Sequence, residues 1–328
     1  MAFHYKKVKI MSINKKSLSA IITSILLLIL VIFNLKQFSL WPQVTNLWES
    51  GFELKNVFQN PHGLRYLLVY PFFIIAEYTN IDYDVIFSFS SIILFYIILK
   101  LNLNLLSYFS IENNISILLV SLLYLLLALE MNGRMLFSII GSSFIIYTSL
   151  SNKQSILFYP LLFLSITLSS VSSGTFILSI LWVFTYLIFA HEKNKNEVVF
   201  LLTLGFIISF ISIPYIILLV LKNINYFGGG ITGIYNMLHH GIGKIIPIDP
   251  IIIFFIFIYF LISILLSTAI YFIFIRRKIN SRNFKILFLF LLLGCVIGVF
   301  GASTFLYSTP IFILIIAYVV TKCLKIKY

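Results

Sequence analysis

Long apolar segments recur along this chain and constrain its fold more than any other feature. A helix needs about 20 apolar residues to cross about 30 Å of hydrocarbon, and eleven segments approach that length. They are residues 18–35, 65–79, 84–101, 115–130, 134–150, 155–171, 174–190, 198–221, 251–275, 286–302 and 304–321. Because no water reaches the hydrocarbon to satisfy backbone polar groups, each spanning segment must be helical.

The composition excludes the main classes of soluble protein. Hydrophobic residues make up 61% of the 328 residues and charged residues only 10%, whereas a soluble domain has roughly 45–50% and 25%. A soluble enzyme or a DNA-binding domain is therefore excluded. We expect an all-α polytopic membrane protein, a single integral membrane domain over residues 1–328 with about ten transmembrane helices.

Lysine and arginine residues predict how the chain is oriented. They outnumber the acids by 23 to 10, and cytoplasmic loops of membrane proteins carry such an excess. We therefore expect membrane lipids, and no nucleic acid, as partners. The basic residues near both termini predict two cytoplasmic ends, with 276–285 as a cytoplasmic loop and with 36–64 and 222–250 as outer loops.

Eleven spans cannot leave both termini on one side of the membrane. One segment must be re-entrant, or two must form one broken helix. The main candidate is 155–190, where serines and Gly174 interrupt two short arms. The second candidate is 65–79, which is short and contains Pro71.

The first outer loop has an amphipathic stretch. Val44, Leu47, Trp48 and Phe52 recur near a period of 3.6 residues, which is typical of a helix lying on a membrane surface. We therefore expect one outer-face interfacial helix over 43–58, with the tryptophans at the level of the lipid headgroups.

Arg134 is the first candidate for catalysis, because it opens one apolar segment directly after another has ended. Ionisable groups at such positions are costly and usually functional. A guanidinium keeps its charge and offers the planar donors that suit phosphate or pyrophosphate oxygens. The alternative is a structural pair with Glu130, four residues earlier on a helix.

The outer loops supply the other candidates. Glu49, Glu53 and His62 could act as the base toward a sugar hydroxyl, although a solvated helix face would also explain the two acids. The expected substrate-binding residues are Arg65, Lys244, His239, His240 and Tyr235. For the adjacent histidines, a loop that is merely polar is the alternative, since they lack the spacing of a zinc helix.

A second acidic group could be a metal site. Glu77, Asp82 and Asp84 could hold a divalent cation through oxygen ligands, or they could form a polar hairpin between two helices. The spacing of an EF-hand is missing, and the nucleotide-binding motifs are also missing. We therefore expect no metal and no cofactor.

The order of several of these segments resembles the order found in a known protein family. The stretch Pro61-His62-Gly63-Leu64-Arg65-Tyr66, its continuation through Tyr70-Pro71-Phe72-Phe73, and Asn80-Ile81-Asp82-Tyr83 resemble the second and third spans of Wzy-type bacterial polysaccharide polymerases. The likeness extends over residues 61–190. It continues through Asn132-Gly133-Arg134, Ser151-Asn152-Lys153 and the small polar cluster Ser169-Ser170-Val171-Ser172-Ser173-Gly174-Thr175.

The resemblance implies a function at the outer face of the bacterial inner membrane. Wzy-type enzymes polymerise oligosaccharide repeat units linked to polyprenyl pyrophosphate, as in O-antigen and exopolysaccharide. It also implies a lipid-linked oligosaccharide as substrate and a chain-length regulator protein as partner. Two alternatives stay open: a membrane glycosyltransferase that uses polyprenyl-phosphate sugars, and a flippase or transporter of lipid-linked sugars.

Overall fold

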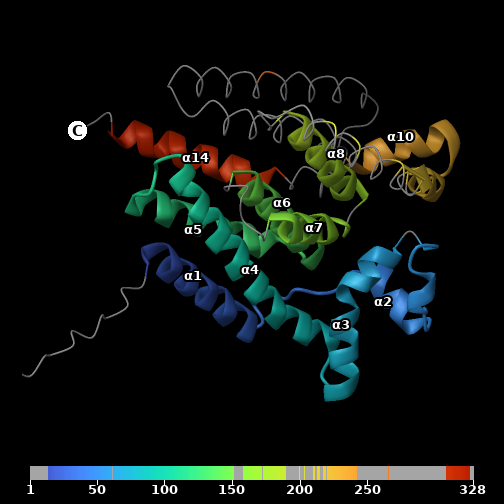
Figure 1. Ribbon diagram of the computed structural model, residues 1–328. Helices are drawn as coiled ribbons and strands as arrows, with labels where there is room; N and C mark the ends of the chain where they lie inside the picture. Colours follow the sequence, from blue (N-terminus) through green and yellow to red (C-terminus); the bar gives the residue numbers. More distant parts are fainter. Residues whose placement is uncertain are drawn as a thin grey trace, which may run out of the picture.

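The computed structural model describes residues 14–60, 62–150, 158–171, 173–189, 220–241 and 308–325, with single positions between 199 and 265. Every element with assigned bounds in this part is helical, which confirms the all-α prediction (Figure 1). The elements are α1 Lys15–Ile32, α2 Pro42–Glu49, the 3-10 helix η1 Leu54–Asn56, α3 Gly63–Thr79, α4 Tyr83–Tyr108, α5 Asn114–Glu130, α6 Gly133–Leu150, α7 Phe158–Ser169, α8 Ser173–Phe189, α10 Gly230–Gly241 and α14 Thr309–Lys325. The expected loop at 276–285 lies outside the described residues.

Three of these helices, α1, α4 and α6, are long and apolar enough to cross a membrane. α5, most of α7 and most of α14 are shorter apolar helices. One side of α1 exposes large apolar side chains such as Ile22, Ile25 and Leu26, while Ala20 and Leu27 are fully buried. An apolar surface of this kind suits contact with lipid, so the chain is a candidate membrane protein.

The bundle has a lysine end, where α1 and α5 begin and where α4 and α14 finish. Lys15 Nζ donates to Asn114 Oδ1 over 3.2 Å, and Lys16 pairs with Glu112 over 3.0 Å. The hydroxyls of Ser116 and Thr321 lie 2.6 Å apart. The first helix thus begins, and the last helix finishes, at the same end of the bundle.

The opposite end, which we call the arginine end, is where α1 and α5 finish and where α4 and α6 begin. Lys36 Nζ donates to Leu129 O over 2.6 Å and so joins the ends of α1 and α5. Leu40 N–H donates to Asp84 Oδ1 over 2.8 Å, which ties the linker after α1 to the first turn of α4. A Cβ atom on Gly133 would meet the Phe87 ring, so only glycine lets α6 begin this close to α4.

Both ends of α3 lie at the arginine end. Its last residue leads through Asn80, in the left-handed conformation at φ 54°, directly into α4. Before its first residue, His62 is within electrostatic range of Arg134 at the start of α6. The predicted span at 65–79 is therefore a helix that packs beside α2, η1 and the first turns of α4.

The predicted surface helix over 43–58 is wrong as a single element. α2 ends at Glu49 in a Schellman motif, in which Gly51 N–H and Phe52 N–H donate to carbonyls of the preceding turn and Gly51 has φ +69°. Because η1 follows as a separate turn, Glu49 and Glu53 do not share a helix face. Trp41 is also only 8% exposed and packs edge-on against Phe137 in the protein core.

Helices α7 and α8 form a hairpin that reaches only to the middle of the bundle. A Cβ atom on Gly141, midway along α6, would meet Ser169 Oγ at the end of α7. Trp182 of α8 donates from Nε1 to Ser149 Oγ, near the end of α6, over 3.0 Å. α8 therefore returns toward the end from which α7 enters. The predicted segment 155–190 is therefore a helical hairpin packed along the second half of α6.

Candidate functional site

Four basic side chains gather at the arginine end, and we call them the cationic cluster: His62, Arg65, Arg134 and Lys222. His62 and Arg65 come from the start of α3, Arg134 from the first turn of α6, and Lys222 from the described segment before α10. Arg65, Arg134 and Lys222 each act electrostatically on His62. The cluster therefore joins three segments that are far apart in the sequence.

Local structure holds these side chains in place. Asn60 Oδ1 accepts the His62 N–H over 2.8 Å, and a Cβ atom on Gly63 would meet the Val57 carbonyl, so glycine permits a close turn into α3. Lys222 Nζ donates to Gln59 O over 3.3 Å, which brings the two predicted outer loops together.

At the start of α6, the Asn132 side chain caps the helix by accepting the Met135 N–H over 2.9 Å. Glu130 and Arg134 do not lie on one helix, as the structural alternative had supposed, because Glu130 ends α5 and Arg134 belongs to α6. Glu130 instead acts on Lys36, where it opposes the lowering of the lysine pKa by burial.

Arg65 fixes the hydrogen-bonding state of His62. Arg65 Nη1 lies 3.0 Å from His62 Nδ1. Because a guanidinium only donates, Nδ1 must accept, and the neutral imidazole then carries its proton on Nε2. Burial, followed by the charges of Arg65, Arg134 and Lys222, lowers the pKa of His62 to about 4. At neutral pH, His62 is therefore an uncharged donor.

This lowered pKa predicts how stability depends on pH. Between the ordinary His62 pKa of 6.5 and about 4, the unfolded chain binds a proton that the folded chain does not. Stability should therefore fall as the pH falls through this window and stay level above it. Thermal unfolding in detergent at about pH 4.5 and about pH 7.5 measures this contribution. His62→Gln should unfold with a smaller difference between the two pH values, and an unchanged difference would contradict the assignment.

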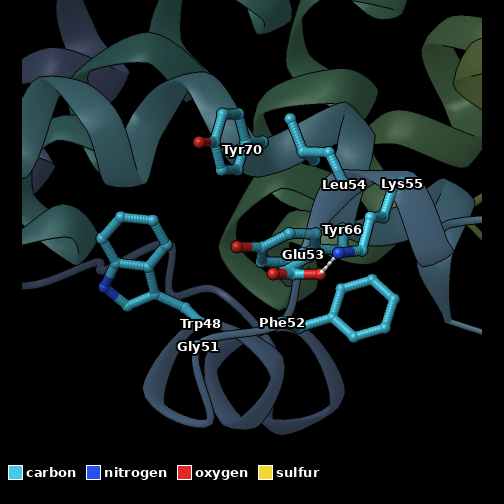
Figure 2. Close-up of a pocket in the computed structure, with 8 residues that line it drawn as sticks. All are labelled: Trp48, Gly51, Phe52, Glu53, Leu54, Lys55, Tyr66 and Tyr70. Atoms are coloured by element: carbon cyan, nitrogen blue, oxygen red, sulfur yellow. Dashed lines mark ion pairs between the residues drawn. The ribbon is translucent and has the colours of Figure 1, made fainter.

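An aromatic pocket of about 530 Å³ lies beside the cationic cluster. We keep the name aromatic pocket for this site, and Figure 2 shows the residues that line it. They are Trp48, Gly51, Phe52, Glu53, Leu54, Lys55, Tyr66 and Tyr70. Trp48 stacks on Phe73 with ring centroids 5.0 Å apart, and Tyr66 meets Phe52 and Tyr70 edge-on. The rings therefore hold one another in fixed orientations.

Helix α3 connects the two features. His62, Tyr66 and Tyr70 are spaced four residues apart, so they lie along one face of the chain as it enters and follows α3. Side chains at this spacing are about 5–6 Å apart. The pocket and the cluster are therefore direct neighbours.

The structure separates the predicted carboxylates. Glu53 lines the aromatic pocket and pairs with Lys55 over 2.5 Å, with both side chains largely exposed. Glu49 is exposed at the end of α2 and does not line the pocket.

The predicted residues of the second outer loop are described only in part. Tyr235 lies on α10 and is 40% exposed. His239 and His240 also belong to α10, but their side chains are outside the described part, as is the whole of Lys244.

Sequence reasoning missed Lys222 and the aromatic lining of the pocket. Lys222 is the first charged residue after the apolar segment 198–221, a signal like the one that identified Arg134. The four-residue spacing of His62, Tyr66 and Tyr70 was also visible in the sequence. Their proximity to Glu53 was not visible, because it depends on the turn at Gly51.

The acidic group near the start of α4 has a structural explanation. Asp82 Oδ1 accepts the Asp84 N–H over 2.6 Å as a helix cap, and Asp84 holds the linker at Leu40. Within the described part of the chain, no three His, Cys, Asp or Glu side chains are grouped so that they could hold a metal ion. The hairpin interpretation therefore accounts for Asp82 and Asp84.

Comparison with known proteins identifies no relative. The chain matches no family model, no curated protein and no solved structure. The function must therefore be argued from the residues themselves.

Proposed function

We propose that this protein is a Wzy-type polysaccharide polymerase, which transfers a growing glycan from polyprenyl pyrophosphate to a sugar hydroxyl of an incoming repeat unit. The observation that carries the proposal is the convergence of Arg65, Arg134 and Lys222 around His62. Three separate segments bring these cations to the end of the bundle opposite Lys15 and Lys16. Such a cluster suits a diphosphate that gains negative charge as it leaves.

The reaction makes specific demands on these groups. The acceptor hydroxyl oxygen attacks the anomeric carbon, and the bond from that carbon to the pyrophosphate oxygen breaks with its electron pair going to the pyrophosphate. The guanidinium groups of Arg65 and Arg134 can stabilise this charge through paired N–H donors. His62, with its proton on Nε2, suits a donor role toward a phosphate oxygen better than the base role expected from the sequence.

The hydroxyl proton must pass to a base, and Glu53 is the better placed of the two acids. Its carboxylate borders the aromatic pocket beside the cluster, whereas Glu49 lies outside the pocket. The carboxylate can take the proton in the transfer step and release it to water afterwards. The reaction needs no nucleotide and no metal.

The geometry supports a membrane topology with fewer spans than the ten expected. α3 has both ends at the arginine end, and α7 and α8 form a hairpin. Removing 65–79, 155–171 and 174–190 from the eleven apolar segments leaves eight. An even number is compatible with two cytoplasmic termini and with the positive loop at 276–285.

This topology orients the site. With the lysine end in the cytoplasm, the arginine end faces outward, on the side away from ATP. α2 and α3 are then helices of the outer face of the bacterial inner membrane. Lipid-linked repeat units and membrane lipids are the expected partners, together with a chain-length regulator protein.

Cysteine labelling tests the orientation. Cys295 and Cys323 are first replaced by serine, and a single cysteine is placed at exposed Asn132, beside Arg134. A membrane-impermeant maleimide added to intact cells with a permeable outer membrane should label this position. A cysteine at exposed Ser107, at the lysine end, should react only after lysis. Labelling of position 107 alone in intact cells would place the cationic cluster in the cytoplasm and contradict the proposal.

Deletion of the gene tests the function. Cells that lack a polymerase still display single repeat units on their surface, whereas cells that lack a flippase display none. We therefore expect single units without polymer, and restoration of polymer by the wild-type gene. An absence of surface repeats altogether would favour a flippase. Polymer loss in Glu53→Gln with full activity in Arg134→Ala would favour the glycosyltransferase alternative.

A further inference from the structure

We infer that the aromatic pocket is the subsite that binds the acceptor saccharide, the sugar whose hydroxyl attacks the donor. This inference rests on the proposed function and adds the location of the second substrate. It comes from the position, lining and charge of the pocket, which lies at the arginine end together with the cationic cluster.

The walls of the pocket suit a sugar ring. Ligand sites typically measure about 300–1,000 Å³, and this one, at about 530 Å³, has room for more than one sugar ring. Trp48, Phe52 and Tyr70 are partly exposed and present aromatic surface, against which the apolar C–H faces of a sugar can pack. Tyr66 is 1% exposed and supports this wall from behind. Because Trp48 is stacked on Phe73 with only 6° between the ring planes, its orientation is set before any ligand arrives.

The polar side chains of the pocket suit the hydroxyl groups at the edge of a sugar ring. Glu53 and Lys55 line the same pocket and pair with each other, as the dashed line in Figure 2 shows. A carboxylate accepts hydrogen bonds from hydroxyls, and an ammonium group donates to them. Since the two side chains are 59% and 73% exposed, their ion pair contributes little stability and can yield to a ligand.

The backbone leaves the entrance open. Gly51 has φ +69°, and a Cβ atom built there would meet nothing within 4 Å. The left-handed turn brings Phe52 and Glu53 back toward α3, while the missing side chain leaves space beside Trp48. The pocket thus lies between the turn that follows α2 and the face of α3 that carries Tyr66 and Tyr70.

The position of the pocket relative to the cationic cluster matches a transfer reaction. Tyr66 follows His62 by four residues at the start of α3, and helical residues at this spacing have Cβ atoms about 5–6 Å apart. A saccharide held against Tyr70, with Tyr66 behind it, would therefore lie toward a diphosphate held at His62 and Arg65. Glu53 would lie on the acceptor side of the reacting atoms, where a base is needed.

Kinetics with the natural substrate test the inference. Lipid-linked repeats are extracted from cells that lack this protein and are supplied to purified protein in lipid vesicles. Because each substitution removes an aromatic contact with the sugar, Trp48→Ala and Tyr70→Ala should each raise KM by roughly 2- to 13-fold while changing kcat less. Tyr70→Phe keeps the ring and should stay near the wild-type KM. Phe58→Ala removes an aromatic ring that is 71% exposed on the same loop, outside the pocket, and serves as the matched control.

A second measurement tests the pocket even if the alanine variants fail to fold. Benzoylphenylalanine at position 70 should crosslink to radiolabelled repeat units under light, whereas the same group at position 58 should not. If wild-type protein makes no polymer from the extract, the proposed function fails, and the acceptor subsite fails with it. If wild-type protein polymerises but position 70 does not crosslink, or folded Trp48→Ala and Tyr70→Ala keep the wild-type KM, only the subsite is wrong.

Discussion

Replacing Arg134 by alanine is expected to reduce polymer formation by at least about 100-fold, the loss that follows removal of one preorganised donor to a developing negative charge. Arg134 is partly buried in the first turn of α6 and acts electrostatically on His62. Its charge would act on the leaving pyrophosphate most strongly in the transition state, so kcat should fall more than KM rises. The measurement is the rate of polymer formation from extracted lipid-linked repeats in vesicles.

Two further variants sharpen this prediction. Arg134→Lys keeps the charge but loses the planar pair of donors, so its rate should lie between wild type and alanine. Lys100→Ala removes an exposed cation from the part of α4 nearer the lysine end and should leave the rate unchanged. Full polymer formation by Arg134→Ala would contradict the role of the cationic cluster, provided that the variant is present in the membrane at the wild-type level.

Replacing Gly141 by leucine is expected to destabilise the protein by about 3 kcal/mol or more, in the upper part of the range for overpacking a filled core. The Cβ atom alone would meet Ser169 Oγ and lie 3.1 Å from Ser165 O. α6 is buried along most of its length, so the side chain has no outward path. α7 must then move away from α6, and the hairpin loses its close packing. Close approach of this kind at small residues is a main source of helix association in membranes.

Unfolding by a denaturing detergent, followed by circular dichroism, measures this loss. The matched control is Leu118→Phe, which enlarges a side chain on α5 that is 69% exposed and should leave stability unchanged. Gly141→Ala should fall between wild type and leucine. If Gly141→Leu unfolds at the same detergent fraction as wild type, the close packing of α6 on α7 is wrong.

The sequence predicted the all-helical architecture because that architecture depends only on the solvent. In hydrocarbon, every backbone polar group must be satisfied within its own segment, so apolar runs such as 84–101 and 134–150 indicate helices without knowledge of their neighbours. The serine-rich break within 155–190 was also readable, because small polar residues interrupt an apolar run locally. Arg134 stood out for a similar reason, as a charge at the edge of such a run, and Glu53 stood out as an acid of the predicted outer loop 36–64.

Only the tertiary structure shows where these residues meet. Hydropathy cannot distinguish a helix that crosses the bundle from one whose two ends lie at the same end of it. Only its packing against α2, η1 and α4, and the charge of Arg134 acting on His62, show that α3 is of the second kind. Lys222 reaches the cationic cluster through packing between segments more than 150 residues apart, as its bond to Gln59 shows. The pocket depends on one left-handed glycine, Gly51, whose turn separates Glu49 from Glu53. Local sequence determines which segments avoid water, but the site is formed by long-range contacts that no local pattern encodes.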